Sequence, residues 1–234
     1  MTLARIAFYA PIKPPDHPIA SGDREIARLI VRALGMAGHD VDLASKCIAY
    51  VKRPDADDFR EKKARAQAEV ERILAAVKSG DAAPDAWLTY HPYCKAPDWI
   101  GPEVCRALQI PYATVEACHS SQKDHPVWEQ GRAQVRDGVN LAATNFCLKP
   151  TDRRYLETIL HKKDTIFDLA PFIDTSEIKV SPGHSPPRFC LPDFGAAVPS
   201  RSIYPEILTI PKGLQTRHPR SPGGRPAWSC HHPR

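Results

Sequence analysis

The chain has 234 residues, of which 42% are hydrophobic and 25% charged, as in ordinary globular proteins. Its formal net charge of +5 comes entirely from residues 181–234, because residues 1–180 carry 25 basic and 25 acidic side chains. An electroneutral body excludes an overall basic field of the kind that attracts nucleic acid or an anionic membrane.

Short apolar runs alternate with helical patterns from the N-terminus to about residue 170. The runs have the length of buried strands and lie at residues 6–10, 41–44, 86–90, 112–115, 141–144 and 165–169. Helical spacing of apolar residues predicts helices at 22–37, at 57–79, after Gly101, at about 127–136 and from Thr151 onward.

This alternation predicts an α/β fold with a Rossmann-like, doubly wound and mostly parallel sheet, covered by helices on both faces. In such sheets, ligands bind beyond the carboxyl ends of the strands. The loops at 11–22, 91–97 and 116–125 follow predicted strands, so they are the candidate site loops.

The chain after about residue 180 has a different composition. Residues 181–234 hold 11 of the 24 prolines and no sustained periodicity, so they cannot bury enough apolar surface to offset the entropy of ordering. Two interpretations are open: a genuine disordered basic tail, or translation that has left the original reading frame of a GC-rich gene. We therefore expect one domain at 1–178, and an irregular Pro/Arg-rich tail without a domain at 179–234.

The first loop has no Gly-x-Gly-x-x-Gly fingerprint, so binding of NAD or FAD is not expected. It places Ser21 and Gly22 at the start of the first helix, where backbone N–H groups can hold a phosphate or a sugar hydroxyl. The alternative is plain capping, with Ser21 as the N-cap residue.

Polar residues follow the third and fourth predicted strands. His91 and His119 can each act as a general base, orient a substrate hydroxyl, or simply bond to the backbone. Glu116 can accept hydrogen bonds from substrate hydroxyls or be solvated. A zinc site from these histidines with Cys94 and Cys118 lacks the usual close ligand spacing, so no metal is expected.

Taken together, several motifs in order resemble the N-terminal domain of a GT-B glycosyltransferase of family 4 (group 1). A "small-Gly" pair follows the first strand in that family, and "Gly-His-x-Val" introduces the second. The matching stretches are RIAFYAP at 5–11, SGD at 21–23, GHDV at 38–41, DAWLTYH at 85–91, 110–119, ATN at 143–145 and LAPFID at 169–174.

The resemblance implies hexosyl transfer from a nucleotide sugar, such as a UDP- or GDP-hexose, to a glycan or lipid-linked acceptor. The N-terminal domain of the family supplies the acceptor pocket, and its first loop approaches the donor diphosphate. His119 matches a family histidine that affects catalysis, and Ser21, Gly22, His91 and Glu116 are expected to bind substrate. No cofactor is implied, since helix dipoles and basic side chains stabilise the leaving nucleoside diphosphate.

The donor-binding domain of the family carries a Glu-x7-Glu segment, whereas residues 181–234 contain one glutamate. We therefore expect a truncated glycosyltransferase that is inactive alone, completed by a separately encoded C-terminal domain. The alternative is a non-catalytic acceptor-binding module. A third hypothesis, nucleic-acid binding by the basic tail, depends on residues 181–234 alone, and no nucleic-acid partner is expected.

Seven cysteines without a C-x-x-C pair argue against a disulfide framework and favour a reducing compartment. The sequence has no run of about 18 apolar residues and begins with a poor signal peptide. We therefore expect a cytoplasmic protein with at most peripheral membrane contact.

Overall fold

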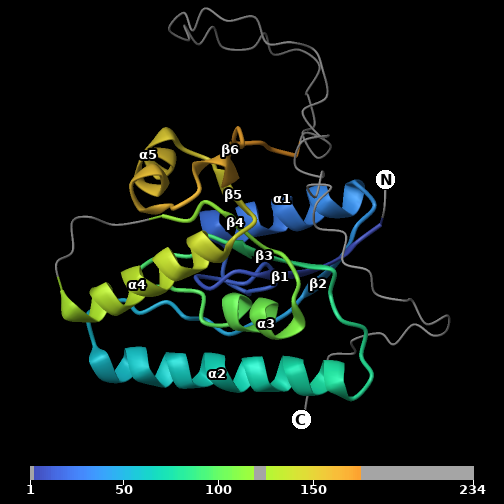
Figure 1. The fold of residues 1–234 in the computed structure, drawn as a ribbon, viewed down its shortest axis with the longest axis horizontal. Helices are drawn as coiled ribbons and strands as arrows, with labels where there is room; N and C mark the ends of the chain where they lie inside the picture. Colours follow the sequence, from blue (N-terminus) through green and yellow to red (C-terminus); the bar gives the residue numbers. More distant parts are fainter. Residues whose placement is uncertain (1–2, 119–124, 175–234) are drawn as a thin grey trace, which may run out of the picture.

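The computed structural model describes residues 3–118 and 125–174, which form one parallel sheet with flanking helices (Figure 1). The six strands lie in the order β2-β1-β3-β4-β5-β6, and every neighbouring pair is parallel. Their bounds are β1 Arg5–Tyr9, β2 Asp40–Leu43, β3 Ala86–Tyr90, β4 Tyr112–Val115, β5 Thr144–Cys147 and β6 Ile166–Asp168. The predicted α/β class and parallel pairing are confirmed.

Helices cover both faces of this sheet, as predicted. In Figure 1, α1 lies on one side of the strands, and α2, α3 and α4 lie together on the other. The helices are α1 Gly22–Met36, α2 Ala56–Lys78, α3 Gly101–Leu108, α4 Pro126–Leu141 and α5 Pro150–Ile159, with a 3-10 turn at Lys163–Thr165. Helix α5 packs beside α4 through Leu156, which lies in one apolar cluster with Val135 and Val139.

One helix and one strand differ from the sequence prediction by more than a residue at one end. The helix expected at 127–136 continues to Leu141, because Val135 and Val139 extend its buried seam. The strand expected at 141–144 begins only at Thr144, so the apolar run 141–143 ends the helix and leads into the strand. Asn145 is fully buried within this strand, where its side-chain amide donates to the carbonyl oxygen of Val139 over 3.0 Å.

Alternation along the strands divides the core between the two faces. Tyr9 and Trp87 point toward α2 and α3, while Phe8 and Leu88 point toward α1. After β6, the chain packs Leu169 and Phe172 against the α1 side of the sheet. Burying large side chains on both faces is the main apolar stabilisation of such a sheet.

A buried carboxylate connects the sheet to α3. Asp98 accepts hydrogen bonds from the hydroxyls of Thr89 (2.5 Å) and Tyr112 (2.9 Å) and from the backbone N–H groups of Ile100 and Gly101 (2.8 Å each). These four donors satisfy a charge that would otherwise be costly in the core. Asp98 is therefore a structural group that anchors the N-terminus of α3.

The described residues contain no helix long and apolar enough to cross a membrane. All five of their cysteines are free thiols. The tail expected at 179–234 lies outside the described residues, so the domain boundary at 178 stays a prediction.

Candidate functional site at the carboxyl edge of the sheet

The parallel sheet brings the ends of β1, β3, β4 and β5 to one edge, where two predicted site residues meet partners that were not predicted. His91 follows β3 and Glu116 follows β4. The chain folds back from β1 through the loop at 10–21, so the first turn of α1 reaches the same edge and contributes Asp23. Lys149 and Asp152 come from the start of α5, just after β5.

His91 lies between a carboxylate and a thiol. Its Nδ1 is 2.9 Å from Oδ1 of Asp23, and its Nε2 is 3.4 Å from Sγ of Cys118. Because a carboxylate only accepts, Nδ1 carries a proton, and in the tautomer with its single proton on Nδ1 the free Nε2 accepts the S–H of Cys118. The bond from His91 lowers the pKa of Asp23. The arrangement fixes the tautomer that a general base requires.

The Cys118 thiol is a hydrogen-bond donor in this arrangement rather than an activated nucleophile. Its burial, reinforced by Asp152 and Glu116, raises the pKa of Cys118 to about 12. A reactive thiolate needs the opposite environment, with neighbouring positive charge that lowers its pKa. The Asp23–His91–Cys118 arrangement is thus unsuited to thiolate chemistry, and its useful group is Nε2 of His91.

Two residues at this edge adopt the left-handed backbone conformation. His91 has a φ of 56° and Glu116 a φ of 55°, although neither is glycine. Each still donates its backbone N–H to the next strand, His91 to Val115 and Glu116 to Phe146, both over 2.8 Å. For a residue other than glycine, this left-handed conformation costs about 1–2 kcal/mol of folding free energy. Residues in such strained conformations are concentrated at functional sites.

Glu116 is buried, with 3% of its surface exposed, and both of its carboxylate oxygens are engaged. Oε2 accepts from the hydroxyl of Tyr90 over 3.1 Å, and Oε1 pairs with Nζ of Lys149. The bond to Glu116 raises the pKa of Lys149, which favours its ammonium form. The predicted contact of Glu116 with a substrate stays a prediction. Lys149, whose side chain is 60% exposed, is the member of the pair that a ligand can reach.

Asp152, in the first turn of α5, has a buried oxygen for which the described residues provide no hydrogen-bond donor. The residue is 9% exposed, and its Oδ2 is unpaired. Burial raises its pKa, and it interacts electrostatically with Lys149, Glu116 and His91. Buried polar atoms are paired in the great majority of cases, so this oxygen calls for an explanation.

Ser21 caps α1, as the capping alternative expected, because its hydroxyl accepts from the backbone N–H of Arg24 over 3.2 Å. Gly22 begins the helix, and a Cβ added there would meet no heavy atom within 4 Å. Packing within the described part of the chain therefore does not demand glycine at this position. Open space at a helix N-terminus is compatible with the predicted approach of a substrate.

His119, the predicted catalytic residue, lies outside the described residues, next to Cys118. Within the described residues, no group of three His, Cys, Asp or Glu side chains could hold a metal ion.

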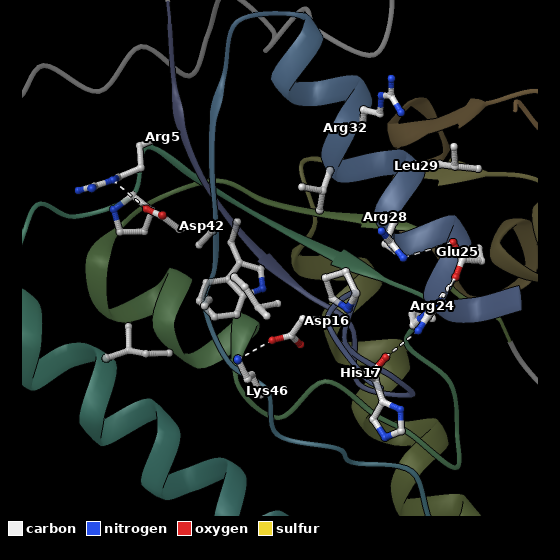
Figure 2. Close-up of a pocket in the computed structure, with 18 of the residues that line it drawn as sticks. Arg5, Asp16, His17, Arg24, Glu25, Arg28, Leu29, Arg32, Asp42 and Lys46 are labelled. Atoms are coloured by element: carbon white, nitrogen blue, oxygen red, sulfur yellow. Dashed lines mark hydrogen bonds and ion pairs between the residues drawn. The ribbon is translucent and has the colours of Figure 1, made fainter. Parts of the chain in front are cut away.

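A well-formed cavity lies elsewhere, along the outer side of β2 (Figure 2). This edge groove has a volume of about 1080 Å³, and its lining includes none of the residues gathered around His91. Its cations pair with carboxylates of the same wall: Arg5 with Asp42, Lys46 with Asp16, Arg24 and Arg28 with Glu25, and Arg32 with Asp174. Although the groove is a cavity, the strained backbone at His91 and Glu116 and the unpaired oxygen of Asp152 favour the carboxyl edge as the functional site.

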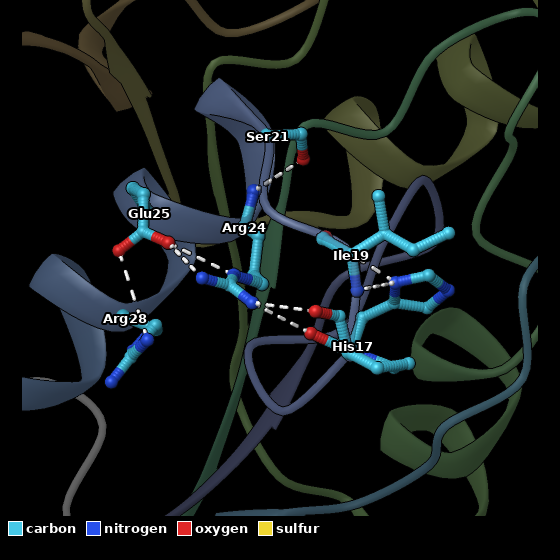
Figure 3. Close-up of polar contacts among 7 residues, drawn as sticks. His17, Ile19, Ser21, Arg24, Glu25 and Arg28 are labelled. Atoms are coloured by element: carbon cyan, nitrogen blue, oxygen red, sulfur yellow. Dashed lines mark hydrogen bonds and ion pairs between the residues drawn. The ribbon is translucent and has the colours of Figure 1, made fainter.

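Arg24 has a clear structural role in the wall of the edge groove (Figure 3). Its guanidinium donates to the carbonyl oxygens of His17 (2.9 Å) and Pro18 (3.3 Å) and to Glu25 (2.6 Å). These bonds hold the loop after β1 against α1, and thereby help to position Asp23.

Comparison with protein-family models and with curated proteins gives no match. Among solved structures, a co-structure of S. aureus MnaA with UDP has 16% identity and a TM-score of 0.45 over 70% of this chain and 43% of that chain. The UDP-GlcNAc 2-epimerase of Methanocaldococcus jannaschii has 18% identity and a TM-score of 0.46, with 70% and 45% covered. A further UDP-N-acetylglucosamine 2-epimerase has 16% identity and a TM-score of 0.42, with 71% and 48% covered. The chain spans less than half the length of each of these structures.

Proposed function

We propose that this domain supplies the acceptor side of a glycosyl-transfer reaction, in which a hexose passes from a nucleotide sugar to a glycan or lipid-linked acceptor. One observation carries the proposal: the Asp23–His91 pair and the Lys149–Glu116 pair meet at the carboxyl edge of a parallel sheet, on backbone that is strained at His91 and Glu116. The proposal is also supported by the motifs between residues 5 and 174 that resemble the N-terminal domain of family 4 glycosyltransferases.

The geometry suits a hydroxyl acceptor. In the tautomer that places the ring proton on Nδ1, Nε2 of His91 is an acceptor, and the thiol of Cys118 that contacts it makes only a weak hydrogen bond. An acceptor hydroxyl that replaces this thiol would be oriented by His91, and its proton could pass to Nε2. Asp23 would stabilise the resulting imidazolium across the 2.9 Å contact. His119 keeps its predicted catalytic role in the proposal.

A UDP- or GDP-hexose is the proposed donor, held chiefly by a second Rossmann-like lobe, as in the family that the motifs resemble. Ser21 and Gly22 would then face the donor from this domain, with the open space at Gly22 admitting the diphosphate. Transfer accordingly requires the donor-binding lobe, and the isolated acceptor side is expected to bind glycans without turning over nucleotide sugar.

A glycan array tests the proposal with the full chain, a His91→Ala variant and a His161→Ala control, whose histidine is exposed and remote in the sequence from the strand ends. We expect the wild type and the control to retain the same glycans, and His91→Ala to lose them at least tenfold. An array without any glycan signal for the wild type would contradict the proposal.

A second experiment separates an enzyme from a binding module. Radiolabelled UDP- and GDP-hexoses are incubated with the full chain and a retained glycan, with and without a GT-B donor-binding lobe supplied in trans. The proposal expects transfer only when that lobe is present. Glycan binding without transfer in either mixture would favour the non-catalytic acceptor-binding module.

A further inference from the structure

Three carboxylates lie at the carboxyl edge, and they differ in how they are paired. Asp23 bonds to His91, and Glu116 bonds to Tyr90 and Lys149. Asp152 is the exception, because its buried Oδ2 has no hydrogen-bond partner among the described residues. The ammonium group of Lys149 and the Nδ1 of His91 are engaged with the other two carboxylates. Within the described part of the chain, the site therefore presents one acceptor oxygen without a donor.

This unpaired oxygen is unfavourable for folding. A buried acceptor without a donor loses its hydration without gaining a hydrogen bond, and the loss is greater for a charged group. The first turn of α5 offsets part of this cost, because a carboxylate is favoured at a helix N-terminus. Lys149, the N-cap residue, makes no side-chain cap bond and directs its ammonium group to Glu116 instead. The local structure thus keeps Asp152 unpaired although a cation stands three residues away.

We propose that Asp152 is a specificity-determining residue, whose Oδ2 accepts a hydrogen bond from a hydroxyl of a neutral sugar bound at this edge. The assignment deepens the proposed function and depends on it. A hydroxyl supplies the missing donor without bringing a second negative charge into a buried site. A carboxylate or phosphate on the sugar would stand against Asp152 and Glu116, so uronic acids and sugar phosphates are rejected.

The test uses nitrogen–proton NMR of the full chain titrated with three probes: glucose, glucuronic acid and glucosamine. Shifts of the backbone amides of Cys147 and Arg153, which flank the start of α5, report binding at this subsite. We expect glucose to shift these amides at millimolar concentration and glucuronic acid to leave them unchanged. In Asp152→Asn the glucose affinity should fall about tenfold, the loss expected for a hydrogen bond to a charged group.

Two further variants keep the test decisive. Asp57→Asn removes an exposed aspartate from the first turn of α2, so it controls for the loss of a helix-terminal charge and should bind glucose as the wild type does. Asp152→Glu keeps the charge but displaces the oxygen. It should also weaken glucose binding, and it replaces Asp152→Asn if that variant fails to fold.

The outcomes separate this inference from the proposed function. Glucose binding that Asp152→Asn leaves intact, or equal binding of glucuronic acid, would overturn the role of Asp152 while leaving a sugar site in place. Stronger binding of glucosamine than of glucose would make the recognised group an ammonium and overturn the hydroxyl assignment. If none of the probes and no glycan on the array binds, the proposed function fails and this inference fails with it.

Discussion

Oδ1 of Asp23 lies 2.9 Å from Nδ1 of His91, across a sequence separation of 68 residues. This contact joins the first turn of α1 to the end of β3. It determines which ring nitrogen of His91 carries the proton, so the nitrogen that faces Cys118 is the free acceptor. The chemistry proposed for this edge depends on that assignment, and removing the contact has measurable consequences.

Asp23→Asn should lower the free energy of unfolding at pH 7 by about 1 kcal/mol, the typical net value of a protein hydrogen bond, because the Asp23 side chain is partly exposed. Because the bond lowers the folded-state pKa of Asp23 from 3.8, its stabilisation is fully present above that value. It is lost as the pH falls through the lowered folded-state pKa. Urea unfolding of both proteins across this range measures the difference, and a pH-independent difference would argue against the pair.

The left-handed backbone at His91 gives a second expectation. With φ at 56°, alanine at this position retains the strain, whereas glycine removes it. His91→Gly should therefore be more stable than His91→Ala by about 1 kcal/mol, the reverse of the order found in regular structure. Equilibrium denaturation compares the two variants directly, and an alanine variant at least as stable as the glycine variant would show that the backbone is unstrained.

Cys118 should resist alkylation in the folded protein. A pKa raised to about 12 leaves almost no thiolate at pH 8, so iodoacetamide should modify Cys118 far more slowly than it modifies the same residue in urea. Peptide mapping by mass spectrometry resolves this cysteine from the others. Rapid alkylation in the native protein would reveal an activated thiol and make the Asp23–His91–Cys118 arrangement a nucleophilic triad instead.

The hydrogen bonds to the buried side chain of Asp98 should contribute more to the free energy of unfolding than an exposed ion pair does. Asp98→Ala leaves the hydroxyls of Thr89 and Tyr112 without their acceptor, so we expect a loss of about 3 kcal/mol or more. Asp137→Ala is the matched control. Its ion pair with Arg106 is exposed and contributes less than about 1 kcal/mol. Similar losses for the two variants would contradict the structural role assigned to Asp98.

The presence and the parallel pairing of the strands could be predicted because short apolar runs alternate with helical patterns. Two predicted strands, β3 and β4, have the predicted bounds. The boundary between α4 and β5 could not be placed, because the run Leu141-Ala142-Ala143 suits either element. Its assignment depends on tertiary packing, in which Val139 belongs to the cluster shared with α5.

The position of His91 and Glu116 at one edge could also be predicted, since both follow strands that pair in parallel. The partners of these residues could not. Asp23 looks like an ordinary first-turn acid of a helix, and its contact with His91 depends on how the loop after β1 folds back. Asp152 has the same local signature, a helix-starting acid, and only the three-dimensional structure shows that one of its oxygens is buried and unpaired.

A crystal structure of the full chain with a neutral glycan retained on the array tests the central claim most directly, because the edge groove and the carboxyl edge are separate places on the molecule. The account predicts sugar density beyond β3, β4 and β5, with one hydroxyl at Nε2 of His91 and another at Oδ2 of Asp152. Density for the glycan in the groove beside β2, with the carboxyl edge unchanged, would contradict it.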